Sequence, residues 1–254
     1  MKSRIMADVN VQLGIKHILE RIEAAYIKRG PSVQTKRPTL IAVSKTKPID
    51  MIIDAYSVGQ RHFGENYVKE LFEKGTNELL HQQCPDIKWH FIGHLQSSQV
   101  NKVLKVPNLE MIETVDSIKL ADLLNQKWSN ISTEKRLNVL VQVNTSSEEE
   151  KSGIPPNEVI DMYRHIVENC KHLALKGLMT IGKFGHDYSL GPNPDFECLL
   201  KCHTNVCSSF NLKADEVEIS MGMSDDFEHA VEMGSTIVRV GSSIFGYRPK
   251  KNEQ

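Results

Sequence analysis

The chain lacks long apolar runs and any excess of charge of one sign. No apolar run approaches the roughly 20 residues that a membrane-spanning helix needs. The 254 residues carry a formal net charge of −1, which gives no overall field to attract nucleic acid or an anionic membrane. Lys2 and Arg4 are followed by Asp8 and Asn10 before any apolar signal core forms. We therefore expect no nucleic-acid or membrane partner and a cytoplasmic location, with at most a minor mitochondrial fraction.

Cysteine is scarce and odd in number. The odd count favours free thiols in a reducing compartment. Cys198, Cys202 and His203 invite comparison with a metal site, but the two cysteines lie one helical turn apart and no second ligand pair of suitable spacing exists. We interpret them as ordinary helix residues and predict no metal ligand. The five cysteines are Cys84, Cys170, Cys198, Cys202 and Cys207.

Nucleotide-binding fingerprints are also missing, since no G-x-G-x-x-G or Walker loop occurs. Eight short apolar segments alternate instead with helical patterns. Their connections suit parallel crossovers and are too long for hairpins. Eight such units in about 250 residues predict a single (β/α)8 barrel, whereas the alternative, an open doubly wound sheet, would need a nucleotide fingerprint. The expected strands are Thr39–Ser44, Arg61–Phe63, Lys88–Ile92, Met111–Thr114, Asn138–Val143, Leu175–Met179, Glu216–Ile219 and Thr236–Val240.

The whole chain, residues 1–254, is expected to form this one domain. Residues 1–38 form a helical extension with an amphipathic helix from about Val9 to Arg29, and residues 249–254 form a flexible tail. The segment Gly182–Pro194 is a loop after the sixth strand, where it can act as a lid over the barrel mouth. Further helices are expected at Ile49–Val58, Val68–Asn77, Ser97–Leu104, Ser117–Trp128, Pro156–Asn169, Asp195–Phe210 and Asp225–Met233.

Polar residues at the carboxyl ends of the strands indicate the site, because barrels of this type place their chemistry there. Lys45 ends the first apolar strand, where desolvation favours the unprotonated amine that forms a Schiff base. Gly/Ser turns follow the seventh and eighth strands, at Ser220–Ser224 and Gly241–Ser243, and loops at these positions often bind phosphate. A lysine facing a phosphate site suggests pyridoxal 5′-phosphate (PLP). The alternatives are a solvated lysine and ordinary turns.

Arg239 is the most informative single residue, because a charge between Val238 and Val240 needs a partner if it is buried. It either faces the pyridine nitrogen of the cofactor, which it would keep unprotonated, or lies outside the barrel against a helix carboxylate. His90 and His94 lack a third metal ligand, so one is expected near the cofactor and the other in the ordering of its loop.

Several blocks of the sequence resemble one family in composition and order. They are Ala42–Pro48, Phe63–Tyr67, Trp89–Gln96, Gly177–Gly182, Ser220–Ser224 and Arg239–Gly246. From about Val9 to Arg248 the chain is similar to the pyridoxal phosphate homeostasis proteins, also called proline synthase co-transcribed proteins. The loop Phe184–Phe196 looks like the eukaryotic version. The resemblance implies a barrel like the amino-terminal domain of alanine racemase, with Lys45 carrying the cofactor, Ser224 and Gly241–Ser242 contacting its phosphate, and Arg239 near its ring.

The resemblance also implies that the protein binds, stores and delivers PLP and balances vitamin B6 pools without robust catalysis. Glu65–Asn66 either contacts the cofactor or caps the following helix. We expect no catalytic residue. The expected cofactor-binding residues are Lys45, Asn66, His90, Met179, Ser220, Ser224, Arg239, Gly241 and Ser242.

Two other functions remain open from the sequence. A weak PLP-dependent racemase would need a second base, which alanine racemase takes from a carboxyl-terminal domain, and this chain ends soon after Tyr247. A barrel that binds another phosphorylated metabolite would need no covalent lysine. We expect a carrier that passes PLP to apo-enzymes, and a monomer.

Overall fold

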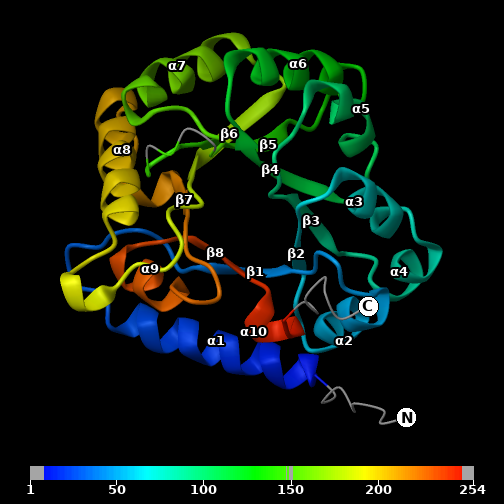
Figure 1. The fold of residues 1–254 in the computed structure, drawn as a ribbon. Coiled ribbons are helices and arrows are strands. Elements are labelled where there is room, and N and C mark those ends of the chain that lie inside the picture. Colours follow the sequence, from blue (N-terminus) through cyan, green and yellow to red (C-terminus); the bar gives the residue numbers. More distant parts are fainter. Residues whose placement is uncertain (1–8, 147, 149–150, 248–254) are drawn as a thin grey trace.

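Eight parallel strands close into a barrel in chain order, each paired with its neighbours and β8 paired with β1 (Figure 1). The computed structural model describes residues 9–146, 148 and 151–247, so the predicted tail over 249–254 and the first eight residues of the predicted extension lie outside the described residues. The predicted (β/α)8 barrel is confirmed. The strands are β1 Thr39–Val43, β2 His62–Glu65, β3 Lys88–Phe91, β4 Leu109–Val115, β5 Leu137–Gln142, β6 Leu173–Met179, β7 Glu218–Ser220 and β8 Ile237–Val240.

The alternation of side chains along the strands separates the barrel interior from the helical layer. Successive strand residues point to opposite faces, so Ile41 lies inside while Leu40 and Ala42 pack outward. The inward apolar residues form a small cluster in the interior, and the outward ones join the large core beneath the helices. The inner cluster consists of Ile41, Met111, Leu140, Met179 and Ile237.

The outer helices follow the strands as expected, with some differences at their ends. Ser117 caps α6 through its hydroxyl, which accepts from Leu120 N–H at 3.3 Å. The helix predicted from Asp225 begins at Phe227, and the one predicted over 97–104 begins as a 3₁₀ turn. Two short helices, α4 and α10, were not predicted. The helices are α2 Ile49–Ser57, α3 Val68–Gly75, α4 Glu78–Gln83, α5 Val100–Val103, α6 Ile118–Ser129, α7 Val159–Asn169, α8 Pro194–Phe210, α9 Phe227–Met233 and α10 Ser242–Phe245.

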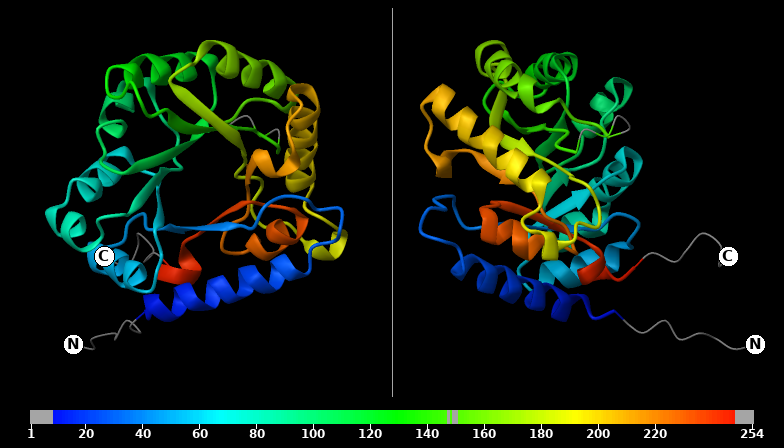
Figure 2. Two further views of the ribbon diagram at one scale, coloured as in Figure 1. Left: turned by 180° about the vertical axis from the view of Figure 1, so that it is seen from behind. Right: turned by 60° about the vertical axis from the view of Figure 1, so that its left-hand side comes forward.

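The amino-terminal helix α1, Val11–Ile27, takes the place of an eighth outer helix. Among the described residues, α10 with its four residues is the one helix that follows β8, and α1 packs against α9, α10 and α2 along that side of the ring (Figures 1 and 2). Gly14 allows the close approach, since a Cβ there would lie 3.1 Å from the carbonyl oxygen of Ile244. Arg21 binds both carboxylate oxygens of Glu228 on α9, at 3.1 and 2.6 Å. The predicted extension thus completes the helical layer.

The segment predicted as a loop, Gly182–Pro194, lies between β6 and α8 and is irregular except for one 3₁₀ turn at Tyr188–Leu190 and for Pro194, which begins α8. Asn193 caps α8 by accepting from Asp195 N–H at 2.9 Å, and Pro194 occupies the first helical turn. None of the described helices is both long enough and apolar enough to cross a membrane.

We expect the packing of α1 to contribute strongly to stability. Ile18 is fully buried, so Ile18→Ala should lower the free energy of unfolding by about 2–5 kcal/mol through lost apolar burial and a cavity. Leu19→Ala, at a neighbouring position that is 43% exposed, is the matched control and should change it little. Urea unfolding measures both. Equal effects of the two substitutions would show that α1 is not an integral part of the core.

Candidate functional site

A cavity of about 520 Å³ opens at the carboxyl ends of β1, β6 and β8. Seven of the nine residues predicted from the sequence line it, although they lie up to two hundred positions apart in the chain. Apolar side chains from Val43, Ile92, Ile181, Phe184 and Met223 complete the wall. The seven predicted residues are Lys45, Asn66, Met179, Ser224, Arg239, Gly241 and Ser242.

Lys45 reaches the cavity because it continues the inward side of β1 just beyond the end of the strand. Ile41 lies in the inner cluster and Val43 lines the cavity, and Lys45 has the same alternation. The side chain is half-buried. Lys47 lines the same cavity, and its ammonium group donates to the carbonyl oxygens of Phe245 and Gly246 at 2.7 and 2.8 Å. Lys47 therefore ties the β1 loop to the end of α10.

A buried ion pair behind the β1 loop fixes the backbone on one side of Lys45. The Lys74 ammonium group, on α3, donates to the carbonyl oxygen of Ser44 at 2.8 Å and to a carboxylate oxygen of Glu65 at 2.7 Å. The Ser44 hydroxyl donates to the same oxygen of Glu65 at 2.6 Å. Burial raises the pKa of Glu65, and the charge of Lys74 opposes that shift. Glu65 thus serves the structure of the loop.

The other side of Lys45 is held through Thr46, whose backbone has a left-handed φ of 62°. Thr46 N–H donates to Glu70 at 2.6 Å, and the same oxygen of Glu70 accepts from Lys74 at 2.7 Å. A threonine rarely adopts positive φ without local support, which this carboxylate provides. Both neighbours of Lys45 are therefore positioned by α3.

The two Gly/Ser turns meet at the cavity. Gly241 N–H donates to the Ser224 hydroxyl at 3.2 Å, so the loops after β7 and β8 touch. Gly222 has a φ of 96°, and a Cβ there would lie 2.6 Å from Ala230, which makes glycine necessary. Asp226 accepts from Met223 N–H at 2.6 Å and closes the turn before α9. Helix α9 therefore begins at Phe227, three residues after Ser224.

Arg239 lies inside the barrel and is only 4% exposed. Its guanidinium group donates to the hydroxyl of Ser220 at 2.6 Å and to the carbonyl oxygen of Thr180 at 2.7 Å. Ser220 in turn donates to Glu113, on β4 across the barrel, at 2.6 Å. The prediction that Arg239 has an interior position is confirmed, and the alternative of a helix partner outside the barrel is wrong.

His90 and Ser220, the other two predicted residues, lie beneath the cavity in this same network. His90 Nδ1 is 2.9 Å from Glu113, and His90 Nε2 is 2.8 Å from Nδ1 of His62. The chain of contacts therefore runs from His62 through His90, Glu113 and Ser220 to Arg239. The structure places His90 and Ser220 as supports of Arg239, while His94 lies at the rim, 3.3 Å from Asp116.

The charges in this network compensate one another. Burial alone would raise the pKa of Glu113, but the hydrogen bond and charge of His90, together with Arg239, hold that pKa below its usual range. Burial lowers the pKa of Arg239, and Glu113 and Asp226 oppose the shift. Burial and the neighbouring His90 lower the pKa of His62 from 6.5 to about 4. A fixed negative charge thus faces a fixed positive charge across the barrel.

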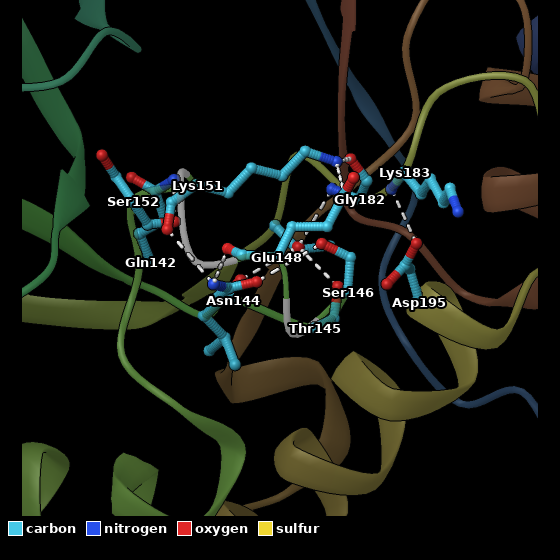
Figure 3. Close-up of polar contacts among 12 residues, drawn as sticks. Gln142, Asn144, Thr145, Ser146, Glu148, Lys151, Ser152, Gly182, Lys183 and Asp195 are labelled. Carbon is cyan, nitrogen blue, oxygen red and sulfur yellow. Dashed lines mark hydrogen bonds and ion pairs between the residues drawn. The ribbon is translucent and has the colours of Figure 1, made fainter.

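A smaller pocket of about 250 Å³ adjoins the cavity and shares Asn66, Ile92 and Ile181 with it. At the rim of this pocket, Lys151 links the loops that follow β5 and β6 (Figure 3). Its ammonium group donates to the carbonyl oxygen of Gly182 at 2.9 Å and forms an ion pair with Glu148. The side-chain oxygen of Asn66 is buried there without a hydrogen-bond partner among the described residues. This orphaned acceptor points to a polar ligand beside Asn66.

The sequence analysis missed the residues that support the site. Glu70 and Lys74 lie on a helix that the sequence shows only as amphipathic, and Glu113 lies within a predicted strand without being singled out. The signal for Glu113 was its charge within an otherwise apolar strand, the same signal that identified Arg239. Pairing these two opposite charges required the strand order.

Comparisons with known proteins agree with this arrangement. The family model of the alanine racemase amino-terminal domain matches residues 31–249. A pyridoxal phosphate homeostasis protein of Homo sapiens is 54% identical over 95% of this chain and 88% of its own length. One of Haemophilus influenzae is 39% identical over 97% of this chain and 99% of its own. The chain belongs to the pyridoxal phosphate homeostasis protein family.

Solved structures support the same family and fold. PipY of Synechococcus elongatus, solved with PLP bound, has a TM-score of 0.71 at 30% identity. The match covers 90% of this chain and 100% of the PipY chain. An alanine racemase of Corynebacterium glutamicum has a TM-score of 0.60 at 13% identity, which shows a shared fold, and this chain covers 63% of it. The resemblance predicted from the sequence is confirmed by these relatives.

The buried pair behind Lys45 should be essential for stability. Lys74→Met leaves Glu65 buried without its cation, so the free energy of unfolding should fall by about 3–5 kcal/mol. Lys69→Met is the matched control on the same helix, because its ammonium group lies 3.8 Å from Glu73 and both side chains are exposed. Denaturant titration of both variants tests this. A loss for Lys74→Met no larger than that of the control would contradict the assigned role.

The network should also give stability a particular pH dependence. His62 has an ordinary pKa of 6.5 when unfolded and about 4 when folded, so below pH 6.5 the unfolded state binds a proton that the folded state does not. His62 therefore leaves the free energy of unfolding unchanged above pH 6.5 and lowers it progressively as the pH falls from 6.5 toward 4. Urea midpoints measured across this range should fall less steeply for His62→Gln than for the parent. Parallel curves would exclude His62 as the cause.

Proposed function

We propose that this protein binds PLP in the cavity at the barrel mouth, carries it as a reversible Schiff base on Lys45, and thereby helps to maintain intracellular vitamin B6. The observation that carries the proposal is the meeting of Lys45 with the Ser224 and Gly241–Ser242 turns in one cavity. The names of the relatives and the PLP bound to PipY support it.

The residues present fit such a ligand. Backbone and hydroxyl donors of the two turns suit a phosphate group, since Gly241 lets the chain approach closely and Ser224 and Ser242 add hydroxyls. The apolar wall suits a planar ring, and Met179 lies at its floor. The orphaned oxygen of Asn66 provides an acceptor for a polar group on that ring. A volume of about 520 Å³ leaves room for the ligand.

Bound PLP supplies an aldehyde that can condense with a lysine amine. Lys45 provides that amine from a backbone held on both sides by α3 and its ion pair. Arg239 has donors but no acceptor and keeps its charge, so it cannot take up a proton and would leave the pyridine nitrogen unprotonated. This arrangement holds a cofactor but supports carbanion chemistry poorly.

A carrier function fits these groups better than catalysis. A racemase needs two acid/base groups fixed on opposite faces of its substrate. Among the described residues that line the cavity, the titratable ones besides the lysines and Arg239 are Asp225 and Tyr247, and both are exposed, Tyr247 by 82%. We infer that the protein is not an enzyme, acts as a cytoplasmic monomer, and passes PLP to apo-enzymes. Weak racemase activity is the alternative.

Removing the lysine should separate covalent from non-covalent binding. Lys45→Ala should abolish the visible Schiff-base absorption and weaken PLP binding by roughly 100-fold, about 2.7 kcal/mol. Lys47→Ala, two residues away, should keep the absorption band. Equilibrium dialysis and absorption spectroscopy measure both. Unchanged affinity and absorption in Lys45→Ala would contradict the proposal.

The carrier and the catalyst give different results with added reactants. For a carrier, the loaded protein should reactivate a PLP-dependent apo-enzyme, while deuterium from solvent should not enter the α-position of added amino acids. Sustained α-deuteration that Tyr247→Phe abolishes would establish the racemase alternative instead.

A further inference from the structure

Three potential metal-binding side chains meet on the outer helical layer, away from the cavity. Asp122 lies on α6, His165 lies on α7, and Cys170 directly follows α7. Their ligand atoms all lie within 4.8 Å of one another. Cys170 is buried, His165 is half-buried and Asp122 is exposed, so the group lies at the surface and is open to solvent on one side.

We propose that Asp122, His165 and Cys170 bind one Zn²⁺ ion between α6 and α7, with water as the fourth ligand. A borderline-soft set of thiolate, imidazole and carboxylate selects zinc over magnesium or calcium, which prefer oxygen ligands alone. Three protein ligands with one open position form a recurring zinc arrangement. This function is independent of PLP binding.

Two of the three separations between the ligand atoms lie near those of a tetrahedral site, and all three are within 4.8 Å. Zinc lies about 2.0–2.3 Å from such ligand atoms, which places those atoms roughly 3.3–3.6 Å apart. His165 Nε2 lies 2.7 Å from Asp122 Oδ1, and Cys170 Sγ lies 3.7 Å from the same oxygen. Asp122 is 54% exposed at its side chain, so its carboxylate can move the roughly 0.6 Å by which the His165–Asp122 separation must widen around an ion.

The binding step exchanges protons for the metal. The Cys170 thiol must lose its proton to solvent, and its sulfur then donates an electron pair to zinc. Binding should therefore release about one proton per ion and strengthen as the pH rises.

No local sequence pattern reveals this group, because its members lie far apart in the chain. Asp122 and Cys170 are 48 positions apart, and only the packing of α6 against α7 joins them. Cys207 and His203 also lie together, one turn apart on α8, with Sγ 3.7 Å from Nε2. Among the described residues, only Asp122, His165 and Cys170 form such a group of three.

Cobalt and zinc titrations of the full chain, stripped first with a chelator, test the proposal. One equivalent of Co²⁺ should produce the visible bands of tetrahedral cobalt and a sulfur-to-metal charge-transfer band in the difference spectrum. Cys170→Ser should remove the charge-transfer band and weaken Zn²⁺ binding by more than roughly 100-fold, since even outer-shell partners contribute 10–100-fold. Cys207→Ser, which removes the thiol beside His203, is the matched control and should retain both.

Thermal unfolding gives an independent readout and guards against a folding defect in Cys170→Ser. Zinc should raise the melting temperature of the parent and of Cys207→Ser, but not of Cys170→Ser or Asp122→Asn. Absence of a charge-transfer band in the parent, or equal zinc affinity in the parent and Cys170→Ser, would overturn the proposal.

Discussion

The buried positive charge of Arg239 is the constraint on which the interior of this barrel depends. A guanidinium group that is 4% exposed must be paired and hydrogen-bonded, or its desolvation would cost several kcal/mol. Two groups accept hydrogen bonds from Arg239: the hydroxyl of Ser220 on β7 and the carbonyl oxygen of Thr180, which follows β6. The opposite charge comes from Glu113, on β4 across the barrel, which accepts from Ser220. Burying this one charged side chain therefore requires a polar group at three other positions of the barrel wall.

This pairing determines which interior positions are polar. In the strand register Ile41 lies beside Arg239 and Met179 beside Ser220, so inward apolar side chains flank the polar chain that runs from His62 to Arg239. The cavity lies above, with Lys45 on its wall. Because Arg239 is held by Ser220 and Thr180, its orientation does not depend on a ligand. A second, separate ion pair, between Lys74 and Glu65, fixes the loop that carries Lys45.

The sequence predicts the barrel well because eight short apolar segments with crossover-length connections leave few other topologies. The side-chain alternation in β1 and β8 also places Lys45, Arg239 and Gly241 on the inner side once the strands are known. Prediction is weaker where contacts join distant positions. The α1 helix looks like an extension until its packing against α9 and α10 is seen. The Glu113–Ser220–Arg239 link and the Asp122–His165–Cys170 group depend on strand order and helix packing, which no local pattern encodes.

The central claim, covalent attachment of PLP to Lys45, is tested most directly by borohydride reduction of the PLP-loaded protein followed by peptide mass mapping. Reduction makes a Schiff base permanent, so the modified residue can be read from the peptide masses. The account predicts a single stoichiometric adduct on Lys45. An adduct on Lys47 or Lys151 in its place, or no adduct after loading with excess PLP, would contradict it.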